Sequence, residues 1–324
     1  MTTPGDGTAR VVGITGGNGF IGRALAARLR RHCTVRLIDV AAGGDVVAAN
    51  VCDKSALAAA LAGCTEIVHL AAAHRDDIAT SEYFDVNVGG TQNVCAAAAA
   101  QGVARIVFAS SAAVYGLQPG APDEDTPPSP AGPYGESKRQ AEEILRQWQG
   151  QDAARRELAI VRPSAVFGIG NRANIWRLMA QAARSNFVMI GKGTNRKSMA
   201  YVENVAAFLD FLMVQPVTPG YRSFNYADKP DIDMNEFCAT VRQALGKSPA
   251  PMLRLPFAAG MAAGTLFDLA AAVTGRKFAI SRSRVLKFCA DTMMSAGRVR
   301  EAGFEPPFTL KEALSETVRA EFGA

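Results

Sequence analysis

A glycine-rich turn near the start of the chain constrains its fold more than any other feature. The turn Thr15–Gly22 lies between an apolar run typical of a strand and an Ala-rich run typical of a helix. Gly16 permits a sharp turn, Gly19 lets the backbone approach a pyrophosphate, and Gly22 lets the helix pack close to the strand. Three glycines alone could form a simple tight turn, but this context predicts a dinucleotide site at a helix N-terminus. The predicted loop contacts are Gly16, Gly19, Phe20, Ile21 and Gly22.

Short apolar runs alternate with helical patterns through the first half of the chain. We expect strands over 11–15, 35–39, 66–71, 105–110 and 158–162, and helices over 19–31, 54–61, 82–100 and 133–148. Near-continuous apolar strands separated by helices are typical of a parallel sheet covered on both faces. The fold class predicted is α/β, a doubly wound Rossmann sheet with a smaller C-terminal substrate-binding lobe.

The regular alternation fades after about residue 165, where Pro- and Gly-rich pieces separate the helical patterns. We expect a flexible lead-in over 1–9 and an NAD-binding Rossmann domain over 10–165, to which some later segments return. Residues 166–324 should form mainly the substrate-binding lobe. The apolar stretch Pro256–Gly275 contains Asp268, and a charge in mid-span is costly in lipid. We therefore expect a buried or dimer-facing helix there rather than a membrane span.

Composition excludes several classes of function. The 324 residues carry a net charge of +5 without any block of basic residues, so nucleic acid is not an expected partner. The six cysteines form no Cys-x-x-Cys pair and no His cluster accompanies them, so no metal site is predicted. The polar N-terminus lacks the apolar core of a signal peptide, which favours the cytoplasm.

An acidic residue ends the second predicted strand. Asp39 follows the glycine turn by about 20 residues, where an acid can bind the adenosine ribose hydroxyls. A carboxylate there repels a ribose 2′-phosphate, and no Arg follows Asp39 directly, so NAD is favoured over NADP. The alternative is that Asp39 only caps a loop, since strand-end acids are also common in turns.

Tyr134 and Lys138 lie four residues apart at the start of a predicted helix, so their side chains share one face. An isolated tyrosine keeps its proton until about pH 10, but a nearby ammonium and a positive nicotinamide ring favour the phenolate. Ser111 closes the fourth predicted strand and could share a proton with Tyr134 and a substrate oxygen. These three residues are the predicted catalytic group. The alternatives are that Tyr134 and Lys138 share a surface helix face by coincidence, and that Ser111 only caps the end of the strand.

Together these residues resemble the extended short-chain dehydrogenases, the nucleotide-sugar epimerase/dehydratase family, and the likeness runs from about Arg10 to Phe322. Further segments fit: Val51–Asp53, Val68–Ala72, Asn87, Asp123–Pro130 and Val161–Pro163. The resemblance implies that Asp53 contacts adenine, that Leu70, Ala71 and Ala72 lie under the cofactor, that Asn87 supports the site, and that Pro163 lies beside the nicotinamide. It also implies a homodimer that pairs the helices 82–100 and 133–148.

Two departures from the family pattern bear on the reaction. Dehydratases of the family carry an Asp-Glu pair after the catalytic hydroxyl residue, whereas this chain has Ala112 and Ala113, so 4,6-dehydration is not expected. Lys197, with Arg196 beside it, occupies the position of the family's diphosphate-binding Arg. We expect Arg196, Lys197 and Ser111 to bind substrate, with Arg282 in a second basic stretch as a further candidate; a solvated helix face is the alternative for Arg282.

The resemblance implies chemistry at C4 of a sugar. Tyr134 would take a proton from the sugar hydroxyl while hydride passes to NAD, leaving a 4-keto intermediate. The leading expectation is an NAD-dependent nucleotide-sugar 4-epimerase, and a ketoreductase for a nucleotide-linked deoxysugar is the runner-up. A 3β-hydroxysteroid-type dehydrogenase and a non-catalytic NAD(H) sensor are weaker alternatives.

Overall fold

A parallel sheet organises the first part of the protein. We analysed a computed structural model that describes residues 10–118, 120–184, 187–249, 253–275 and 281–323; the predicted lead-in 1–9 lies outside these residues. Among them, seven strands form the main sheet: β1 (Val11–Thr15), β2 (Thr34–Asp39), β3 (Val46–Ala48), β4 (Glu66–His69), β5 (Arg105–Ala109), β6 (Glu157–Pro163) and β11 (Gly220–Tyr226). Every neighbouring pair is parallel, which confirms the doubly wound sheet predicted from the sequence.

The strand order β11-β6-β5-β4-β1-β2-β3 places a topological switch between β1 and β4. From β1 the chain builds outward through β2 to β3, and it then returns to start the other half at β4. Loops that leave the carboxyl ends of β1 and β4 therefore diverge and open a crevice, which is where doubly wound sheets bind their ligands.

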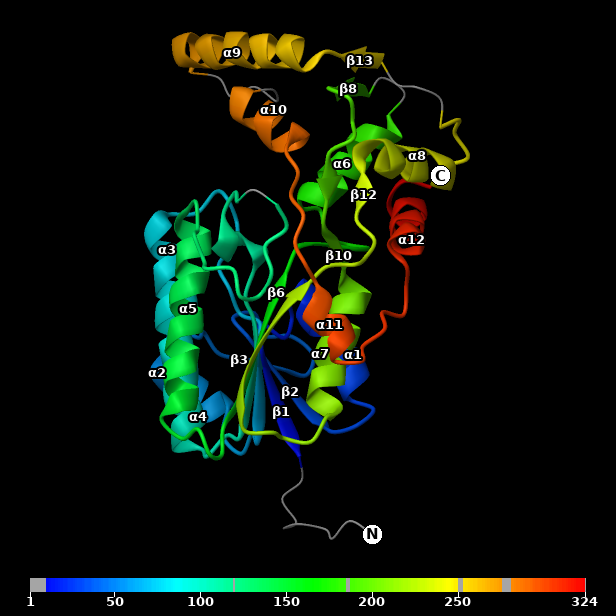
Figure 1. The fold of residues 1–324 in the computed structure, drawn as a ribbon. Helices are drawn as coiled ribbons and strands as arrows, with labels where there is room; N and C mark the ends of the chain where they lie inside the picture. Colours follow the sequence, from blue (N-terminus) through cyan, green and yellow to red (C-terminus); the bar gives the residue numbers. More distant parts are fainter. Residues whose placement is uncertain (1–9, 119, 185–186, 250–252, 276–280, 324) are drawn as a thin grey trace. The chain divides into compact units, whose positions relative to one another are not determined.

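Helices cover both faces of this sheet (Figure 1). One face carries α2 (Lys54–Ala60), α3 (Thr80–Phe84), α4 (Gly90–Ala100) and α5 (Pro133–Gly150), and the other carries α1 (Phe20–Leu29) and α7 (Val202–Val214). The single helix expected over 82–100 is divided, because the π-helical turn η1 (Asp85–Gly89) separates α3 from α4. Two short helices complete this unit: η2 (Ala112–Tyr115) and α11 (Gly297–Glu301).

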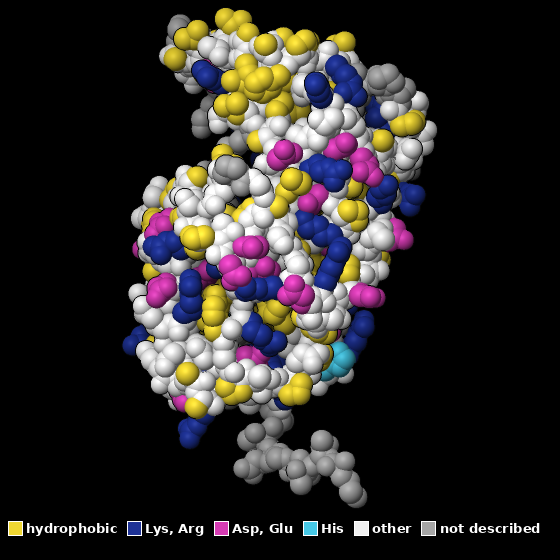
Figure 2. Space-filling view, in the orientation of Figure 1, with side chains coloured by type: hydrophobic (Ala, Val, Ile, Leu, Met, Phe, Trp, Pro, Cys, Tyr) yellow, Lys and Arg dark blue, Asp and Glu magenta, His cyan; other side chains and the backbone are white. Residues whose placement is uncertain are grey.

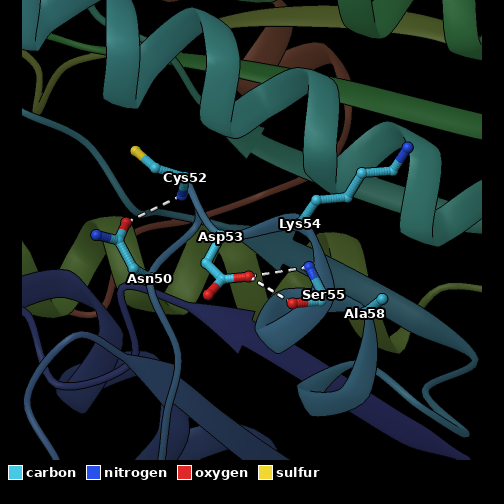
Figure 3. Close-up of a pocket in the computed structure, with 6 residues that line it drawn as sticks. All are labelled: Asn50, Cys52, Asp53, Lys54, Ser55 and Ala58. Atoms are coloured by element: carbon cyan, nitrogen blue, oxygen red, sulfur yellow. Dashed lines mark hydrogen bonds between the residues drawn. The ribbon is translucent and has the colours of Figure 1, made fainter.

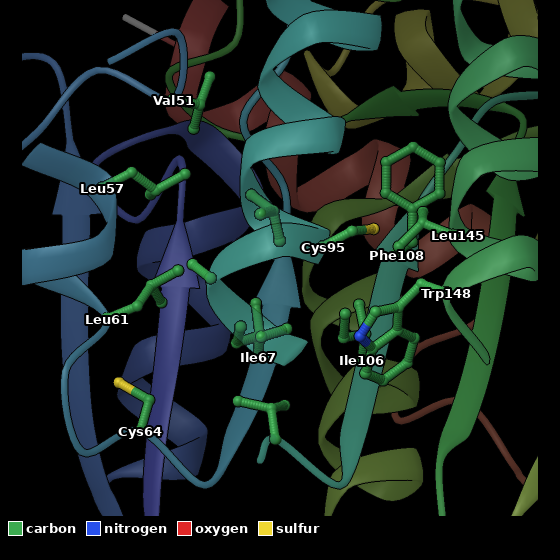
Figure 4. Packing of buried hydrophobic residues seen from close by; sticks show 14 of the residues in the cluster. Val51, Leu57, Leu61, Cys64, Ile67, Cys95, Ile106, Phe108, Leu145 and Trp148 are labelled. Carbon is green, nitrogen blue, oxygen red and sulfur yellow. The ribbon is translucent and has the colours of Figure 1, made fainter. Parts of the chain in front are cut away.

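The core between the sheet and helices α2, α4 and α5 is apolar and closely packed (Figure 4). Ile106 and Phe108 of β5 and Trp148 of α5 belong to this core, and all three are almost fully buried. Cys64 and Cys95 belong to the same cluster as small apolar side chains. This packing fixes α5, which carries the predicted catalytic Tyr and Lys.

A buried ion-pair network joins the amino ends of the central strands. Arg105 Nε donates to Glu157 Oε2 at 2.8 Å, and its Nη1 lies 3.1 Å from Glu66 Oε2. Glu157 also accepts hydrogen bonds from Thr218 N and from the guanidinium of Arg222, a residue of β11. The side chains of Arg105 and Glu157 are both 1% exposed, so each charge depends on the other for its solvation.

We expect Glu157→Gln to destabilise the fold by about 3 kcal/mol, because it leaves the Arg105 charge buried and only partly neutralised. Urea denaturation of the two proteins measures the difference. Glu143→Gln is the matched control, since Glu143 is half exposed and lies 3.8 Å from Arg146. The control should change the free energy of unfolding by less than about 0.5 kcal/mol. Equal effects of the two substitutions would refute the role given to the network.

The chain divides into two units, and the first is discontinuous in sequence. Residues up to Ser164, Ala200–Ala227 and Met294–Pro307 form the first unit, whereas Ala165–Met199, Asp228–Met293 and Phe308–Ala324 form the second. The helices of the second unit are α6 (Asn174–Ala183), α8 (Met234–Ala244), α9 (Phe257–Thr274), α10 (Arg282–Cys289) and α12 (Leu310–Phe322). The remaining short strands are β7 (Ala165–Phe167), β8 (Val188–Ile190), β9 (Arg196–Lys197), β10 (Met199–Tyr201), β12 (Ile232–Asp233) and β13 (Leu253–Leu255).

Helix α9 forms where the apolar stretch Pro256–Gly275 predicts a helix, but it is not buried. Leu266 and Leu269 are 67% and 60% exposed. The expectation of a buried helix is therefore wrong for this chain on its own, and the dimer-facing alternative is untested. Within the described residues, no helix combines the length and apolar character that crossing a membrane requires.

Candidate active site

The glycine turn adopts the close-packed geometry that a phosphate-binding loop needs. Gly16 has φ +68°, and a Cβ on it would lie 2.6 Å from Ala71 N, so no side chain fits there. A Cβ on Gly22 would collide with the Gly16 carbonyl, which explains how α1 can begin directly against the turn. The turn lies at the carboxyl end of β1, and its backbone leads into the N-terminus of α1. These residues fit a bound pyrophosphate.

Asp39 lies beside this turn at the end of β2. Its Oδ2 accepts from Asn18 N at 3.0 Å, and its Oδ1 accepts from Val40 N at 2.8 Å. The carboxylate therefore does cap the turn, as the alternative interpretation expects. It also stands where ribose hydroxyls of a dinucleotide would reach it, because β2 neighbours β1 at the same edge of the sheet. The ribose contact stays a prediction.

Asp53 caps a helix beside an open pocket (Figure 3). Its Oδ1 accepts from Ser55 N and Ala56 N, both at 3.0 Å, and these bonds together with the Ser55 hydroxyl lower the pKa of the carboxyl. The pocket has a volume of about 820 Å³ and is lined by Asn50, Cys52, Asp53, Lys54, Ser55 and Ala58. Contact of Asp53 with an adenine ring stays a prediction, now with a helix-capping role beside it.

The segment after β4 closes the other side of the crevice. Leu70 N donates to Thr15 O at 3.0 Å, which extends the sheet pairing past the end of β4. Ala71 then lies against Gly16, and Ala72 follows it, with all of Leu70, Ala71 and Ala72 half-buried. The predicted cofactor residues of β1 and β4 are thus brought together at the topological switch.

Asn87 ties this segment to the catalytic helix. Its amide nitrogen donates to Ala73 O at 3.0 Å and to Ser137 Oγ at 2.9 Å, while its carbonyl oxygen accepts from Ala73 N at 2.9 Å. Ser137 Oγ in turn donates to Tyr134 O at 2.8 Å. Asn87 lies in the π turn η1, and such turns often mark functional sites. The structure shows it as a support that joins the segment after β4 to α5; direct contact with the cofactor stays a prediction.

Ser111 and Tyr134 meet in the crevice. Ser111 follows β5 and caps η2 by accepting from Ala113 N at 3.1 Å, and its side chain lies beside Tyr134. Burial raises the pKa of the Tyr134 phenol above its ordinary value, whereas the nearby Ser111 hydroxyl lowers it in part. The Tyr134 ring packs against Tyr83, with centroids 6.0 Å apart. The predicted hydroxyl pair is therefore in contact.

Lys138 lies one helical turn after Tyr134 and is almost fully buried. Its Nζ donates to Ala109 O at 2.6 Å and lies 4.0 Å from the centre of the Phe108 ring. Burial lowers the pKa of this ammonium to about 7, and the Glu142 carboxylate opposes that shift.

A buried polar network behind Lys138 was missed by sequence reasoning. Arg162 forms a two-pronged ion pair with Glu142, at 2.8 and 2.7 Å, and its Nη1 donates to the Tyr115 hydroxyl at 2.6 Å. Glu142 also accepts from Ser110 Oγ at 2.6 Å. The network holds β5, β6 and α5 together and places Pro163 at the end of β6. The spacing of Glu142 four residues after Lys138 places the two side chains on one helix face, but it does not point to Arg162 on β6.

The predicted basic substrate residues lie in the second unit. Lys197 Nζ donates to Ala290 O at 3.2 Å, just past the C-terminus of α10, and burial lowers the pKa of Lys197. Arg196 is exposed, and its backbone N donates to Asp291 Oδ1 at 2.6 Å. Arg282 is the first residue of α10, so the helix separates it from Lys197 by about 10 Å. Arg196 and Lys197 are together, and Arg282 is apart from them.

Comparisons with known proteins agree with this geometry. Residues 12–227 match the NAD dependent epimerase/dehydratase family. The chain is 43% identical over 319 residues to an N-acetyl-alpha-D-glucosaminyl-diphospho-ditrans,octacis-undecaprenol 4-epimerase of Escherichia coli O157:H7, covering 95% of this chain and 94% of the relative. It is 30% identical to a 3 beta-hydroxysteroid dehydrogenase/Delta 5-->4-isomerase of Mycobacterium tuberculosis, covering 94% and 88%.

The fold also matches solved structures. A UDP-glucose 4-epimerase of Thermus thermophilus in complex with NAD aligns with a TM-score of 0.72 at 22% identity, covering 97% of this chain and 99% of that one. The glycine turn, the Ser111–Tyr134 contact and the family match over most of the chain lead to one assignment. The chain belongs to the NAD-dependent epimerase/dehydratase family and is an NAD-dependent enzyme of the extended short-chain dehydrogenase type.

Proposed function

We propose that the protein inverts C4 of a sugar that is joined to a diphosphate, through a 4-keto intermediate. The observation that carries the proposal is the 43% identity to a 4-epimerase across nearly the full length of both chains. The sequence predicts a nucleotide sugar as the substrate, and the Escherichia coli relative is named for a polyprenyl diphosphate sugar. Both substrates contain a sugar joined to a diphosphate. The proposed reaction takes place on the sugar, and the predicted basic residues would bind the diphosphate.

Tyr134 is the proposed proton acceptor for the C4 hydroxyl, and Ser111 its partner. The two hydroxyls are neighbours at the carboxyl edge of the sheet, so a substrate oxygen can accept and donate hydrogen bonds with both of them. NAD, when bound, supplies the acceptor and donor for the C4 hydride. In an epimerase the keto sugar must expose its other face to that same hydride before Tyr134 returns the proton.

Lys138 is the proposed electrostatic element of this group. Its ammonium lies on the Ala109 carbonyl, below the crevice that would hold the nicotinamide ribose. When charged it favours the phenolate of Tyr134 and can donate a hydrogen bond to a ribose hydroxyl. The buried Glu142–Arg162 ion pair joins α5 to β6 next to Lys138. These two residues therefore position the catalytic group and do not react.

Arg196 and Lys197 are the proposed diphosphate ligands of the second unit. They are adjacent cations on β9, and Lys binds phosphate as a point charge whereas Arg can bind it through two parallel hydrogen bonds. Arg282 is a further candidate. Ala112 and Ala113 offer no proton-transfer group beside Ser111, which supports epimerisation over 4,6-dehydration.

The 4-epimerase and the ketoreductase differ in how they treat the cofactor. An epimerase regenerates its cofactor within one cycle, so we expect stoichiometric NAD or NADH to be released when the purified protein is denatured. We expect the same protein to invert C4 of UDP-N-acetylglucosamine, or of N-acetylglucosaminyl-diphospho-undecaprenol in detergent, without added cofactor. Run in D2O, the product should keep hydrogen at C4, because the hydride never exchanges with solvent; NMR reads both the configuration and the isotope.

A protein without bound cofactor that reduces 4-keto sugars with added NADH would instead establish the ketoreductase. Oxidation of a 3β-hydroxysteroid would establish the activity named for the Mycobacterium tuberculosis relative. A non-catalytic sensor would bind NAD(H) and turn over none of these substrates, although this chain keeps both Tyr134 and Lys138. The homodimer through α4 and α5 and the cytoplasmic location remain predictions that rest on the family resemblance and the polar N-terminus.

A further inference from the structure

The second unit exposes apolar side chains in one short part of the chain. Seven of the fourteen exposed large hydrophobic side chains among the described residues fall between positions 253 and 286. Figure 2 shows hydrophobic side chains, in yellow, gathered over this part of the second unit, with dark-blue basic side chains beside them. We call six of these exposed residues the apolar surface: Leu253, Leu255, Phe257, Leu266, Leu269 and Leu286. A patch of this kind marks a binding surface when it is contiguous.

Helix α9 directs its leucines away from its own unit, the reverse of the usual packing of a surface helix. Its buried described residues are Gly260 and Gly264, which lie one turn apart. A Cβ on Gly260 would meet the Ile190 side chain of β8, and one on Gly264 would lie 2.7 Å from Arg282 N at the start of α10. The helix thus approaches its own unit closely at its two glycines, where no side chain would fit. Leu266 and Leu269 lie on the opposite face, pointing away from that contact.

The charge around this surface is almost entirely positive. Residues 253–289 contain a single acidic residue, Asp268, and its Oδ2 accepts the backbone N–H of Arg282 at 3.0 Å, on the side of α9 that faces α10. Among the residues of this segment whose side chains the structure describes, the basic ones are Arg254, Arg282 and Arg284, and the Arg254 guanidinium also donates to Lys192 O and Asn235 Oδ1. An apolar helix face with basic residues beside it is complementary to a bilayer that contains anionic lipids. The leucine side chains would lie among the acyl chains, and the basic side chains would bind the anionic headgroups.

We propose that the apolar surface docks the protein on anionic lipid bilayers, with α9 lying in the plane of the headgroups. Helix α9 has 18 residues and carries Asp268 within them, and no helix of the described residues has the length and apolar character of a membrane span, so the proposed contact is peripheral. The proposal rests on the proposed function in one respect: a sugar diphosphate on a polyprenol is held at a membrane, and a docked enzyme meets it there. The docking itself requires no turnover.

Flotation with vesicles tests the docking, using the full chain with its cofactor. We expect wild type to float with phosphatidylcholine vesicles that contain about one third phosphatidylglycerol, and to bind them less as salt rises. The double variant Leu266→Glu/Leu269→Glu should lose at least about tenfold in vesicle affinity, because it places two carboxylates at the lipid face. Both side chains are exposed, so the fold should tolerate the change.

The matched control is Val214→Glu/Val217→Glu, which alters two valines of the first unit that are 43% and 40% exposed. It should float like wild type. Wild type that stays in solution with anionic vesicles would overturn the proposal, and so would a leucine variant that floats as well as wild type. If wild type ignores vesicles and the leucine variant alone dissociates in sedimentation velocity, the surface is instead an interface between two copies.

Activity separates this proposal from the proposed function. Wild type and the leucine variant should turn over a water-soluble sugar diphosphate at equal rates, whereas the variant should be slower on N-acetylglucosaminyl-diphospho-undecaprenol embedded in vesicles. If no sugar diphosphate is turned over but flotation behaves as expected, the proposed function fails and the docking surface stands. If epimerisation occurs but wild type never floats, the docking surface fails alone.

Discussion

Tyr134→Phe should abolish turnover while it leaves NAD affinity within a few-fold of wild type. The substitution removes one hydroxyl, and that hydroxyl is the one that lies beside Ser111 at the carboxyl edge of the sheet. Positioned acid–base groups typically contribute about 10²- to 10⁴-fold to a rate, so we expect kcat to fall by about 10³-fold or more. Steady-state epimerisation assays and NAD titration measure the two quantities separately.

The tyrosine ring itself should matter little to the fold. Phe keeps the ring contact with Tyr83, so the variant should unfold at nearly the wild-type urea concentration. Tyr221→Phe is the control, because Tyr221 is 38% exposed on β11 and its change should leave kcat unaltered. Full activity of Tyr134→Phe would refute the role assigned to the hydroxyl. Equal losses of kcat and NAD affinity would mean that it serves binding and not proton transfer.

The parts of the site that the sequence predicts well are those set by local geometry. The glycine turn needs only residues 15–22, and Tyr134 and Lys138 share a helix face because they are four apart. β1 occupies the residues predicted for it, and β2, β4, β5 and β6 begin or end within two residues of prediction, because nearly continuous apolar runs mark buried parallel strands.

What the sequence predicts poorly depends on contacts between distant segments. β11 joins the main sheet from residues 220–226, and only its partner β6 makes that pairing favourable. The Arg162–Glu142 pair links a strand to a helix 20 residues away, and no local pattern requires it. Helix α9 is a further element whose packing the sequence alone does not predict. Its composition is that of a core helix, and only the packing of Gly260 and Gly264 reveals that its leucines face outward.

Lys138→Met should make the protein more stable near neutral pH even as it removes most of the activity. The pKa of the buried ammonium lies near 7, below its ordinary value of 10.5. Between those two values the unfolded chain holds a proton on this amine that the folded chain has released. The wild-type free energy of unfolding therefore rises with pH across that window, and below about pH 7 the full penalty of burying the charge remains.

Methionine fills a similar volume without a charge, so the variant should lack this pH dependence. Near pH 7 we expect it to be more stable by a few kcal/mol at most, since about 1.4 kcal/mol corresponds to each pKa unit. Loss of the bond to Ala109 O offsets about 1 to 3 kcal/mol of that gain. The difference in the free energy of unfolding between variant and wild type should become steadily smaller as the pH is raised to about 9.5. Urea denaturation at several pH values, with equal cofactor content in both proteins, measures it.

The same substitution should lower kcat by about 10²-fold, because the ammonium no longer favours the Tyr134 phenolate, and the acid side of the pH–rate profile should move to higher pH. Lys311→Met is the control: its Nζ is exposed beside Glu236, so neither rate nor pH dependence of stability should change appreciably. A variant whose stability follows pH in parallel with wild type would show that Lys138 is not the group responsible. A stable but inactive variant would show instead that the fold tolerates a buried lysine at this place because the reaction requires its charge.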